Sequence, residues 1–471
     1  MFSNIENCKK NKLFKKNKKY PHLNLPFKIA GDDKQLQELI IMPREKLNSL
    51  RKNNIKVDKI SSFYKQLIKE QLNIPFYNDD PNAFFNTLNY MFYKIGMGIY
   101  IKIQDNQLKL FVPFANMNFK NNWKEYITYE DDINNIKEFQ KVHNLKQFIH
   151  FDESKWSTNN CLIGHLKSKP SGSPISSSRM VEIRIMLEDL CRTRKIKDVE
   201  FFINKRDFPV IKKDLTEPYY HIFNNKKKNF KKYKYDSYLP ILSPSGSPEY
   251  ADILLPNEDD ILLKYQDKVF INNCFNKFQH FNDIKIPKWD DKIPIALFRG
   301  SATGCGITIR TNQRLNLANK SKNIKDLDAG ITSWNIREKK RINGKLNILI
   351  PDNLNIKLSN KLSFEEQMKY KYLINVDGHV SAFRMSWLLK SKSVILQIES
   401  KDNYKLWFSD LLKPWIHYVP IKSNLSDIKE KIKWCKENDL KCKQIAKNAF
   451  QLANKLNIKD YMQNLLNSFQ L

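Results

Sequence analysis

The 471-residue sequence is poor in cysteine and contains no cysteine motif. Its seven cysteines are scattered along the chain, and no Cys-x-x-Cys pair occurs. Structural zinc modules need closely spaced cysteines, and disulfide-rich secreted folds need many of them, so the sequence favours neither class. Reduced thiols are typical of proteins in the cytoplasm.

Long hydrophobic runs are also missing. The most apolar stretch, residues 88–103, is interrupted by Lys94 and is shorter than the roughly 20 residues that span a bilayer. The N-terminal MFSNIENCKKNKLFKKNKKYP is basic but has no apolar segment behind its charges, so it does not resemble a secretory signal. We therefore expect a soluble, cytoplasmic protein without a membrane span.

Negative charge is scarce, because 81 Lys and Arg residues face 50 Asp and Glu and give a net charge of +31. Such a surplus attracts nucleic acids and anionic surfaces. However, the excess lysine is spread along the chain with abundant Asn and Ile, as in a composition bias, and no nucleic-acid reading motif accompanies it. We predict no specific nucleic-acid partner, and we interpret the basic runs 9–19 and 226–234 as a solvated tail and a loop.

The hydrophobic content of 41% is enough for several cores, and the length suits two or three domains. We divide the chain into a basic flexible tail (1–25), an accessory α+β region (26–150), a first lobe (151–288) and a second lobe (289–471). The accessory region contains an alternating pattern, Gly98–Pro113, that predicts a β-hairpin about a central Asp-Asn-Gln.

Strands and helices alternate through the remainder, which predicts an α/β fold with parallel sheets. The expected strands are 199–203, 293–298, 346–350, 372–376, 394–398 and 417–421. The expected helices are 179–194, 310–317, 381–390, 425–435 and 440–456, and a capping-box pattern at 363–366 opens a further short helix.

The loop RGSATGCG, which begins at Arg299, follows one of these strands. Gly300 and the two later glycines allow backbone amides to approach a ligand, while Ser301 and Thr303 offer hydroxyl groups. Arg299 and Arg310 offer guanidinium groups, and together these residues predict a phosphate or diphosphate site. The alternative is a tight turn that needs glycine for geometry alone.

A second polar strand end reads DGHVSAFR. Gly378 permits a turn, Ser381 stands at an expected helix start, and Arg384 lies one turn further. An anion there would meet free amides, the helix dipole and a guanidinium. The alternative is that Asp377 and Ser381 only cap the helix.

Two further carboxylate positions are candidates for chemistry. Asp207 follows the strand VEFFI, where an ionised carboxylate can serve as a general base; many such residues only form turns. The pair Asp326 and Asp328 matches the Asp-x-Asp of metal-dependent glycosyltransferases, but it follows a Lys/Asn-rich stretch. We therefore expect no metal site, and the scattered histidines indicate none either.

Five stretches, taken together, resemble one family: VEFFINKRDFP, SPEYADILLP, LFRGSATG, KYKYLINVDGHVSAFRMSWLL and LKPWIHYVPIKSNLSDI, in this order between residues 155 and 460. The chain is similar to glycosyltransferase family 90, which includes the Rumi-type protein O-glucosyltransferases and the fungal capsule-associated xylosyltransferases. The Lys/Asn bias and the absence of a leader resemble giant-virus members, which would place the protein in host cytoplasm or in a virion.

The resemblance implies a GT-B fold, in which two Rossmann-like lobes face a cleft. It implies an inverting transfer of glucose or xylose from a UDP-sugar to a hydroxyl of a protein or glycan, with no required metal or other cofactor. It implies Asp207 as the catalytic base and a donor site at Arg299, Gly300, Ser301, Thr303, Ser381 and Arg384, with Arg310 as a further phosphate ligand. A catalytically silent nucleotide-sugar or glycan-binding protein and a basic nucleic-acid-binding protein are the alternatives.

Overall fold

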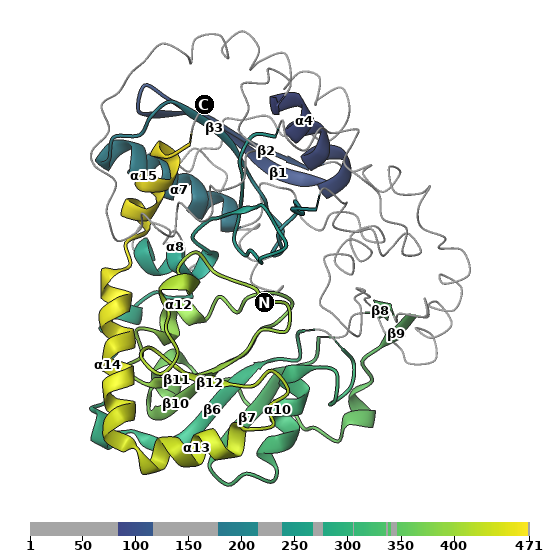
Figure 1. Ribbon diagram of the computed structural model, residues 1–471, viewed down its shortest axis with the longest axis vertical. Helices are drawn as coiled ribbons and strands as arrows, with labels where there is room; N and C mark the ends of the chain where they lie inside the picture. Colours follow the sequence, from purple (N-terminus) through teal and green to yellow (C-terminus); the bar gives the residue numbers. More distant parts are fainter. Residues whose placement is uncertain are drawn as a thin grey trace, which may run out of the picture.

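A computed structural model describes residues 83–115, 178–214, 238–266, 277–304, 306–335, 338–340 and 346–469. The expected flexible tail, most of the expected accessory region and the basic run 226–234 lie outside these residues. The described chain forms two lobes, one above the other in Figure 1, and each lobe is built around a five-stranded sheet. Two parallel-rich sheets with flanking helices confirm the predicted α/β fold of the GT-B type.

The first lobe contains a mixed sheet in the order β2-β1-β3-β4-β5. Its strands are β1 Met97–Gln104, β2 Gln107–Ala115, β3 Val199–Ile203, β4 Ile241–Ser243 and β5 Ile253–Leu254. Strand β1 pairs antiparallel with β2 and β3, whereas β3, β4 and β5 are parallel. Its helical segments are α4 Ala83–Asn89, the π-helix η3 Tyr90–Ile95, α7 Ser178–Thr193 and α8 Glu258–Lys264.

The second lobe contains a wholly parallel sheet in the order β12-β11-β10-β6-β7. Its strands are β6 Ile293–Ser301, β7 Leu327–Ser333, β10 Tyr370–Asn375, β11 Val394–Ile398 and β12 Val419–Ile421. The chain winds outward from β6 to β7 and then restarts at β10 on the other side of β6. In doubly wound sheets ligands bind beyond the carboxyl ends of strands at such a switch point.

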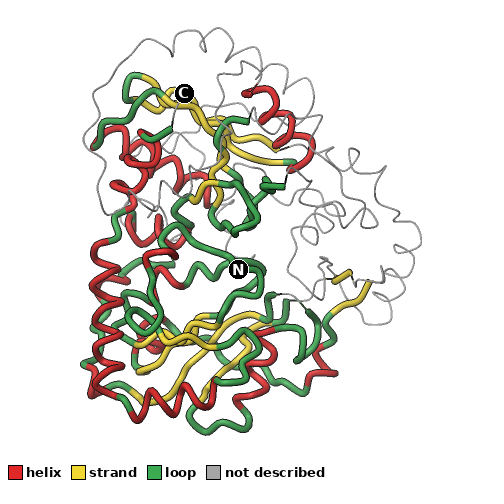
Figure 2. Tube along the Cα trace, in the orientation of Figure 1, coloured by secondary structure: helices red, strands yellow, loops and turns green. Residues whose placement is uncertain are grey.

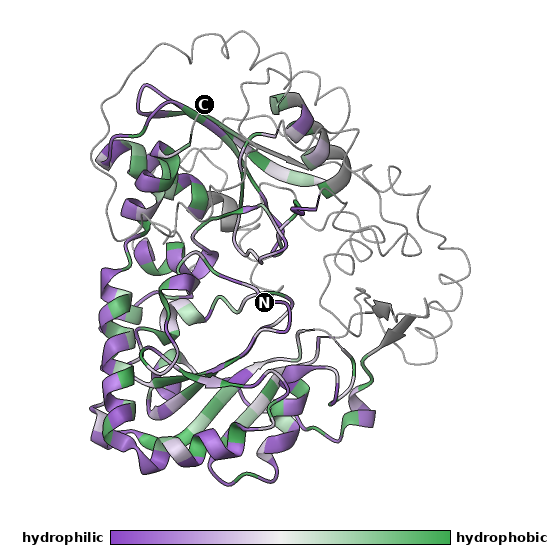
Figure 3. Cartoon of the chain, viewed as in Figure 1, coloured by the Kyte–Doolittle hydropathy of each residue, from purple (hydrophilic) through white to green (hydrophobic). Residues whose placement is uncertain are grey.

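Helices surround the second sheet and link it to the first lobe. They are α10 Gln313–Ser321, α11 Phe364–Met368, α12 Met385–Leu388, α13 Ile428–Glu437, α14 Asp439–Lys455 and α15 Ile458–Asn467. Figure 2 shows that many of the connecting loops gather between the two lobes. In Figure 3, α13 and α14 carry alternating hydrophilic and hydrophobic bands, as expected for helices with one face on a core and one in solvent. No helix of the described ranges is both long and apolar enough to cross a bilayer.

The predicted hairpin is confirmed, but it is not part of a separate accessory unit. Its turn is made by Asp105 and Asn106, whose φ values of 53° and 55° are typical of a two-residue hairpin turn. Strand β1 continues the sheet of the first lobe by pairing Ile99–Ile103 with β3. The expected boundary at residue 150 therefore does not separate the hairpin from the first lobe, because backbone pairing joins segments that are far apart in sequence.

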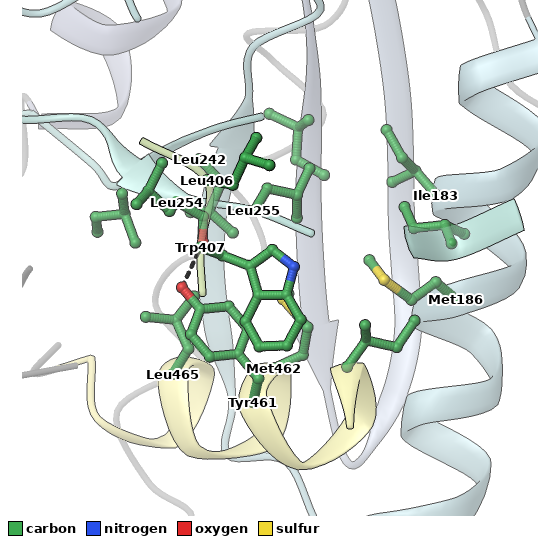
Figure 4. Close-up of a cluster of buried hydrophobic side chains, with 14 of the residues drawn as sticks. Ile183, Met186, Leu242, Leu254, Leu255, Leu406, Trp407, Tyr461, Met462 and Leu465 are labelled. Atoms are coloured by element: carbon green, nitrogen blue, oxygen red, sulfur yellow. Dashed lines mark hydrogen bonds between the residues drawn. The ribbon is translucent and has the colours of Figure 1, made fainter. Parts of the chain in front are cut away.

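The C-terminal helix crosses from the second lobe back to the first. In α15, Tyr461 is fully buried and its hydroxyl donates to the Leu254 carbonyl at 2.6 Å. Figure 4 shows that its ring packs on Trp407. The two ring centroids are 4.6 Å apart. The Trp407 indole donates to the Asp260 carboxylate of α8 at 2.8 Å, so the seam between the lobes is both apolar and hydrogen-bonded.

The structure differs from the sequence prediction at three places in the second lobe. Arg299–Ser301 continue β6 rather than opening a loop, because they pair with β7. Strand β7 was not predicted from the sequence, since a Lys/Asn-rich stretch precedes it. The expected strand at 346–350 becomes β9 Leu346–Ile348, which pairs antiparallel with β8 Glu338–Lys340 outside the main sheet. The expected helix at 381–390 shrinks to α12, because the Asp377 side chain accepts the Ala382 amide and holds the preceding segment in a turn.

A buried ion pair links the hairpin to β3. Lys102 of β1 is opposite Glu200 of β3, the charged atoms are 3.6 Å apart, and the side chains are 0% and 2% exposed. Replacing Lys102 by Met should lower the free energy of unfolding by about 3–5 kcal/mol, because it leaves a buried carboxylate unpaired. Urea denaturation measures the loss.

Two further variants make this test specific. Adding Glu200→Gln to Lys102→Met should recover much of the lost stability. Lys109→Met on the exposed face of β2 should change stability by less than about 0.5 kcal/mol. A Lys102→Met loss no larger than that of Lys109→Met would contradict the place of the hairpin in the first sheet.

Candidate functional site

A cleft of about 370 Å³ lies at the carboxyl ends of β6 and β10, between the two lobes. The first lobe supplies Asp207 and, from α8, Glu258 and Asp259. The second lobe supplies most of the remaining lining: Arg299, Thr303, Arg314, Phe364, Gln367, Gly378, His379, Val380, Ser381, Ala382, Phe383, Arg384 and Trp387. Polar groups from distant segments thus converge in one concave site, as is typical of ligand-binding clefts.

The side chain of Arg314 holds together the two strand ends that form the floor of this cleft. Its Nη1 donates to the Ser301 carbonyl at 3.1 Å and to the Thr303 hydroxyl at 2.5 Å. Its Nη2 donates to the Val376 carbonyl at 3.1 Å, and its Nε to the Asp377 carbonyl at 2.9 Å. One buried guanidinium therefore fixes the end of β6 against the end of β10.

A second guanidinium, that of Arg384, lies across the end of β6. Its Nη1 donates to the Arg299 carbonyl at 2.9 Å, and its Cζ lies 5.0 Å from the centre of the Phe298 ring. A Cβ added at Gly300 would be 2.8 Å from Arg384 Nη2 and 2.9 Å from the Phe298 ring. A larger residue at this position would therefore displace Arg384 or the Phe298 ring, which gives Gly300 a more specific role than the loop flexibility expected from the sequence.

The two guanidinium groups concentrate positive charge in the cleft. Among the described residues neither Arg314 nor Arg384 forms an ion pair with a carboxylate. Burial lowers the pKa of Arg314 to about 9, with the charge of Arg384 as the second cause, and burial lowers the pKa of Arg384 to about 10. Both groups stay charged at neutral pH, so an anion in the cleft would relieve their mutual repulsion.

The turn after β10 supplies hydrogen-bonding groups to the same cleft. The Ser381 hydroxyl is buried and has no hydrogen-bond partner among the described residues. The Gly304 amide donates to His379 Nδ1 at 3.2 Å, and the φ of 120° at Gly304 is one that glycine tolerates best. Gly378, next to Thr303 and Arg314, also lines the cleft.

Arg299 and the Asp-x-Asp pair are engaged with other side chains. Arg299 lines the cleft, but its Nη2 is 2.7 Å from the Asp328 carboxylate of β7. Asp326 pairs with Lys436 of α13 at 2.8 Å. Within the described residues no group of three or more His, Cys, Asp or Glu side chains is arranged to hold a metal ion.

The opposite wall of the cleft comes from the first lobe. Asp207 is half-buried and directly follows Arg206, whose Nη2 donates to the Ile95 carbonyl at 2.6 Å. Asp259 of α8 is buried and forms an ion pair with Lys277 at 2.5 Å. Carboxylates of this lobe thus line the same cleft as the guanidinium groups of the other.

The structure brings together most of the residues predicted from the sequence, with four exceptions. Gly300 contacts Arg384 but is not part of the cleft lining. Arg310 is exposed and does not line the cleft. Ser301 accepts a hydrogen bond from Ser333 at 2.8 Å and does not line it either. Asp377 lines a narrow adjoining pocket, and burial raises its pKa to about 6.

Sequence reasoning missed Arg314, Asp259 and Lys277. A signal for Arg314 was present, because it lies in the first turn of a helix, where a positive charge opposes the helix dipole. Asn312 caps that helix by accepting from the Arg314 and Leu315 amides. The helix dipole therefore does not explain an arginine at this position. Its hydrogen bonds to the floor of the cleft do. No comparable signal pointed to Asp259 or Lys277.

Replacing Arg314 by Lys should lower the free energy of unfolding by about 2–4 kcal/mol, because an ammonium group cannot satisfy the four buried acceptors of the guanidinium. The matched control is Arg310→Lys, four residues earlier and exposed, which should change stability by less than about 0.5 kcal/mol. Chemical denaturation of both variants makes the comparison. Equal losses would show that Arg314 does not hold the cleft floor.

Comparison with known proteins agrees with this geometry. The profile of the family described as Glycosyl transferase family 90 matches residues 173–470. "Uncharacterized protein 179R" of Invertebrate iridescent virus 6 is 37% identical over 452 residues, which cover 84% of this chain and 38% of that protein. Protein O-glucosyltransferase 3 of Homo sapiens is 34% identical over 271 residues, which cover 57% of this chain and 45% of that protein.

The chain thus spans less than half the length of these two relatives. The family match nevertheless includes both Asp207 and Arg384, and it covers more than half of the chain. The chain belongs to glycosyl transferase family 90.

Proposed function

We propose that this protein is an inverting glycosyltransferase that moves a sugar from a UDP-sugar to a hydroxyl group. The observation that carries the proposal is the pair of cleft guanidinium groups, Arg314 and Arg384, opposite the carboxylate of Asp207. A nucleotide diphosphate suits two fixed positive charges, and a nearby carboxylate suits the removal of a proton from an acceptor.

The donor's diphosphate would lie at the carboxyl ends of β6 and β10. Arg384 presents its guanidinium to the cleft, and the unpartnered Ser381 hydroxyl can donate to a phosphate oxygen. Negative charge grows on the diphosphate as the bond to the sugar breaks, and pre-oriented cationic groups stabilise that charge. We therefore propose that Arg384 and Arg314 do the work that a divalent ion does in metal-dependent transferases.

Asp207 would act as the general base from the first lobe. Its carboxylate takes the proton of the acceptor hydroxyl while the hydroxyl oxygen attacks the anomeric carbon of the sugar. UDP leaves from the opposite face, so the configuration at that carbon is inverted. Holding acceptor and donor in one cleft supplies much of the rate by fixing their approach.

Glucose is the first sugar to test, because similar proteins carry the name protein O-glucosyltransferase. Xylose is the second, on the family resemblance described above. The same names favour a protein hydroxyl as acceptor over a glycan. A non-catalytic protein that only binds a nucleotide sugar is the competing function, and the presence of Asp207 in the cleft lining speaks against it.

Replacing Asp207 by Asn should lower kcat about 10²- to 10⁴-fold, because the amide cannot accept the proton. Binding of the UDP-sugar should be unchanged. The measurement is UDP release with UDP-glucose and UDP-xylose in the presence of EDTA, with and without acceptor. Asp352→Asn, an exposed Asp of the second lobe, is the control. Full activity of Asp207→Asn would contradict the assigned base, and activity that needs an added divalent ion would contradict the proposed metal independence.

Replacing Arg384 by Gln should weaken UDP binding about 10- to 100-fold, because a charge-assisted hydrogen bond in a partly buried site is worth about 1.5–3 kcal/mol. Isothermal titration calorimetry with UDP measures the change. Arg310→Gln tests the arginine that the sequence also indicated, and its exposure predicts less than a threefold effect. A larger loss in Arg310→Gln than in Arg384→Gln would place the diphosphate elsewhere.

A further inference from the structure

The segment that carries Asp207 is held from several sides by buried side chains outside the cleft. Asn204, at the end of β3, donates through Nδ2 to the Phe208 carbonyl at 2.6 Å. Its Oδ1 accepts the Arg206 amide at 2.8 Å. Asn204 thus bonds both chain neighbours of Asp207.

A buried carboxylate fixes the far end of the same segment. Asp252 accepts the Val210 and Ile211 amides, both at 2.8 Å, through its two oxygens. It also accepts the Ser243 hydroxyl at 2.6 Å. Burial raises the pKa of Asp252 to about 6, so the side chain remains mostly ionised at neutral pH and can accept from all three donors.

Ser243 joins these two halves into one network. It donates to Asp252, and its oxygen accepts from Asn204 Nδ2 at 3.0 Å. Because Ser243 ends β4 and is 0% exposed, it fixes both partners to the sheet of the first lobe. None of these three side chains lines the cleft, so the network does not contact a ligand there.

We propose that Ser243 and Asp252 are positioning residues for the Asp207 carboxylate. The proposal rests on the proposed function, since it assigns Asp207 the role of the base. A proton is transferred efficiently only when the base lies within hydrogen-bond distance of the hydroxyl. The network sets the position of the Asp207 backbone through Asn204 on one side and through Val210 and Ile211 on the other.

The chain offers a matched pair of serines for the test. Ser243 and Ser245 are two residues apart and both 0% exposed, but the Ser245 hydroxyl has no hydrogen-bond partner within the part of the chain that the structure describes. Ser243→Ala and Ser245→Ala therefore both remove a buried hydroxyl group. Only Ser243→Ala removes one that belongs to the network. Asp252→Asn is the second network variant. It replaces one accepting oxygen of Asp252 by an NH₂ group, which cannot accept a hydrogen bond from its donor.

We expect Ser243→Ala to lower kcat about 10- to 100-fold, as small displacements of catalytic groups do, while the Kd for UDP stays within twofold. Ser245→Ala should leave both unchanged. Hydrogen exchange followed by mass spectrometry should show faster exchange across residues 204–211 in Ser243→Ala only. In the Asp207→Asn background, Ser243→Ala should cause no further fall in rate, because its effect passes through Asp207.

Three results would overturn the proposal. They are equal behaviour of the two serine variants, parallel losses of UDP affinity and kcat in Ser243→Ala, and a further rate loss on top of Asp207→Asn. A chain that turns over no UDP-sugar would instead refute the proposed function. The exchange experiment would then still show whether Ser243 and Asp252 hold the segment, so the two failures are separable.

Discussion

The wall of the cleft that the second lobe supplies depends on the hydrogen bonds of one buried guanidinium group, that of Arg314. A parallel sheet leaves its strand ends as separate loops, and side-chain hydrogen bonds join the loops after β6 and β10. Arg314 joins them by donating to acceptors on both sides, including the Ser301 and Val376 carbonyls. This contact fixes Thr303 relative to Asp377, whereas Arg384 is held by the Arg299 carbonyl.

The two lobes bring different charged side chains to the cleft. The second lobe places positive charge where a doubly wound sheet binds ligands, at the switch point between β6 and β10. The first lobe places carboxylates, Asp207 and Asp259, on the facing wall. The crossing of α15 holds the lobes together through an apolar seam around Trp407 and Tyr461, so side chains of both lobes line one cleft.

Several buried polar groups serve geometry rather than reaction. Lys102 and Glu200 join the hairpin to β3, and Ser243 and Asp252 hold the segment that carries Asp207. Buried polar groups are costly unless they are paired, so each must be matched by partners from elsewhere in the fold. Such residues lie outside the cleft, and a search restricted to cleft-lining groups would overlook them.

The sequence by itself determined the alternation of strands and helices, the hairpin at 98–113, and the polar strand ends that hold Asp207 and Arg384. These are local patterns of period, turn chemistry and spacing. Only the tertiary structure decided that the hairpin joins the first sheet, that Arg310 is exposed while Arg314 holds the cleft floor, and that Asp328 engages Arg299. These depend on strand pairing and on side chains that meet across tens or hundreds of residues, and local periodicity carries no information about such meetings.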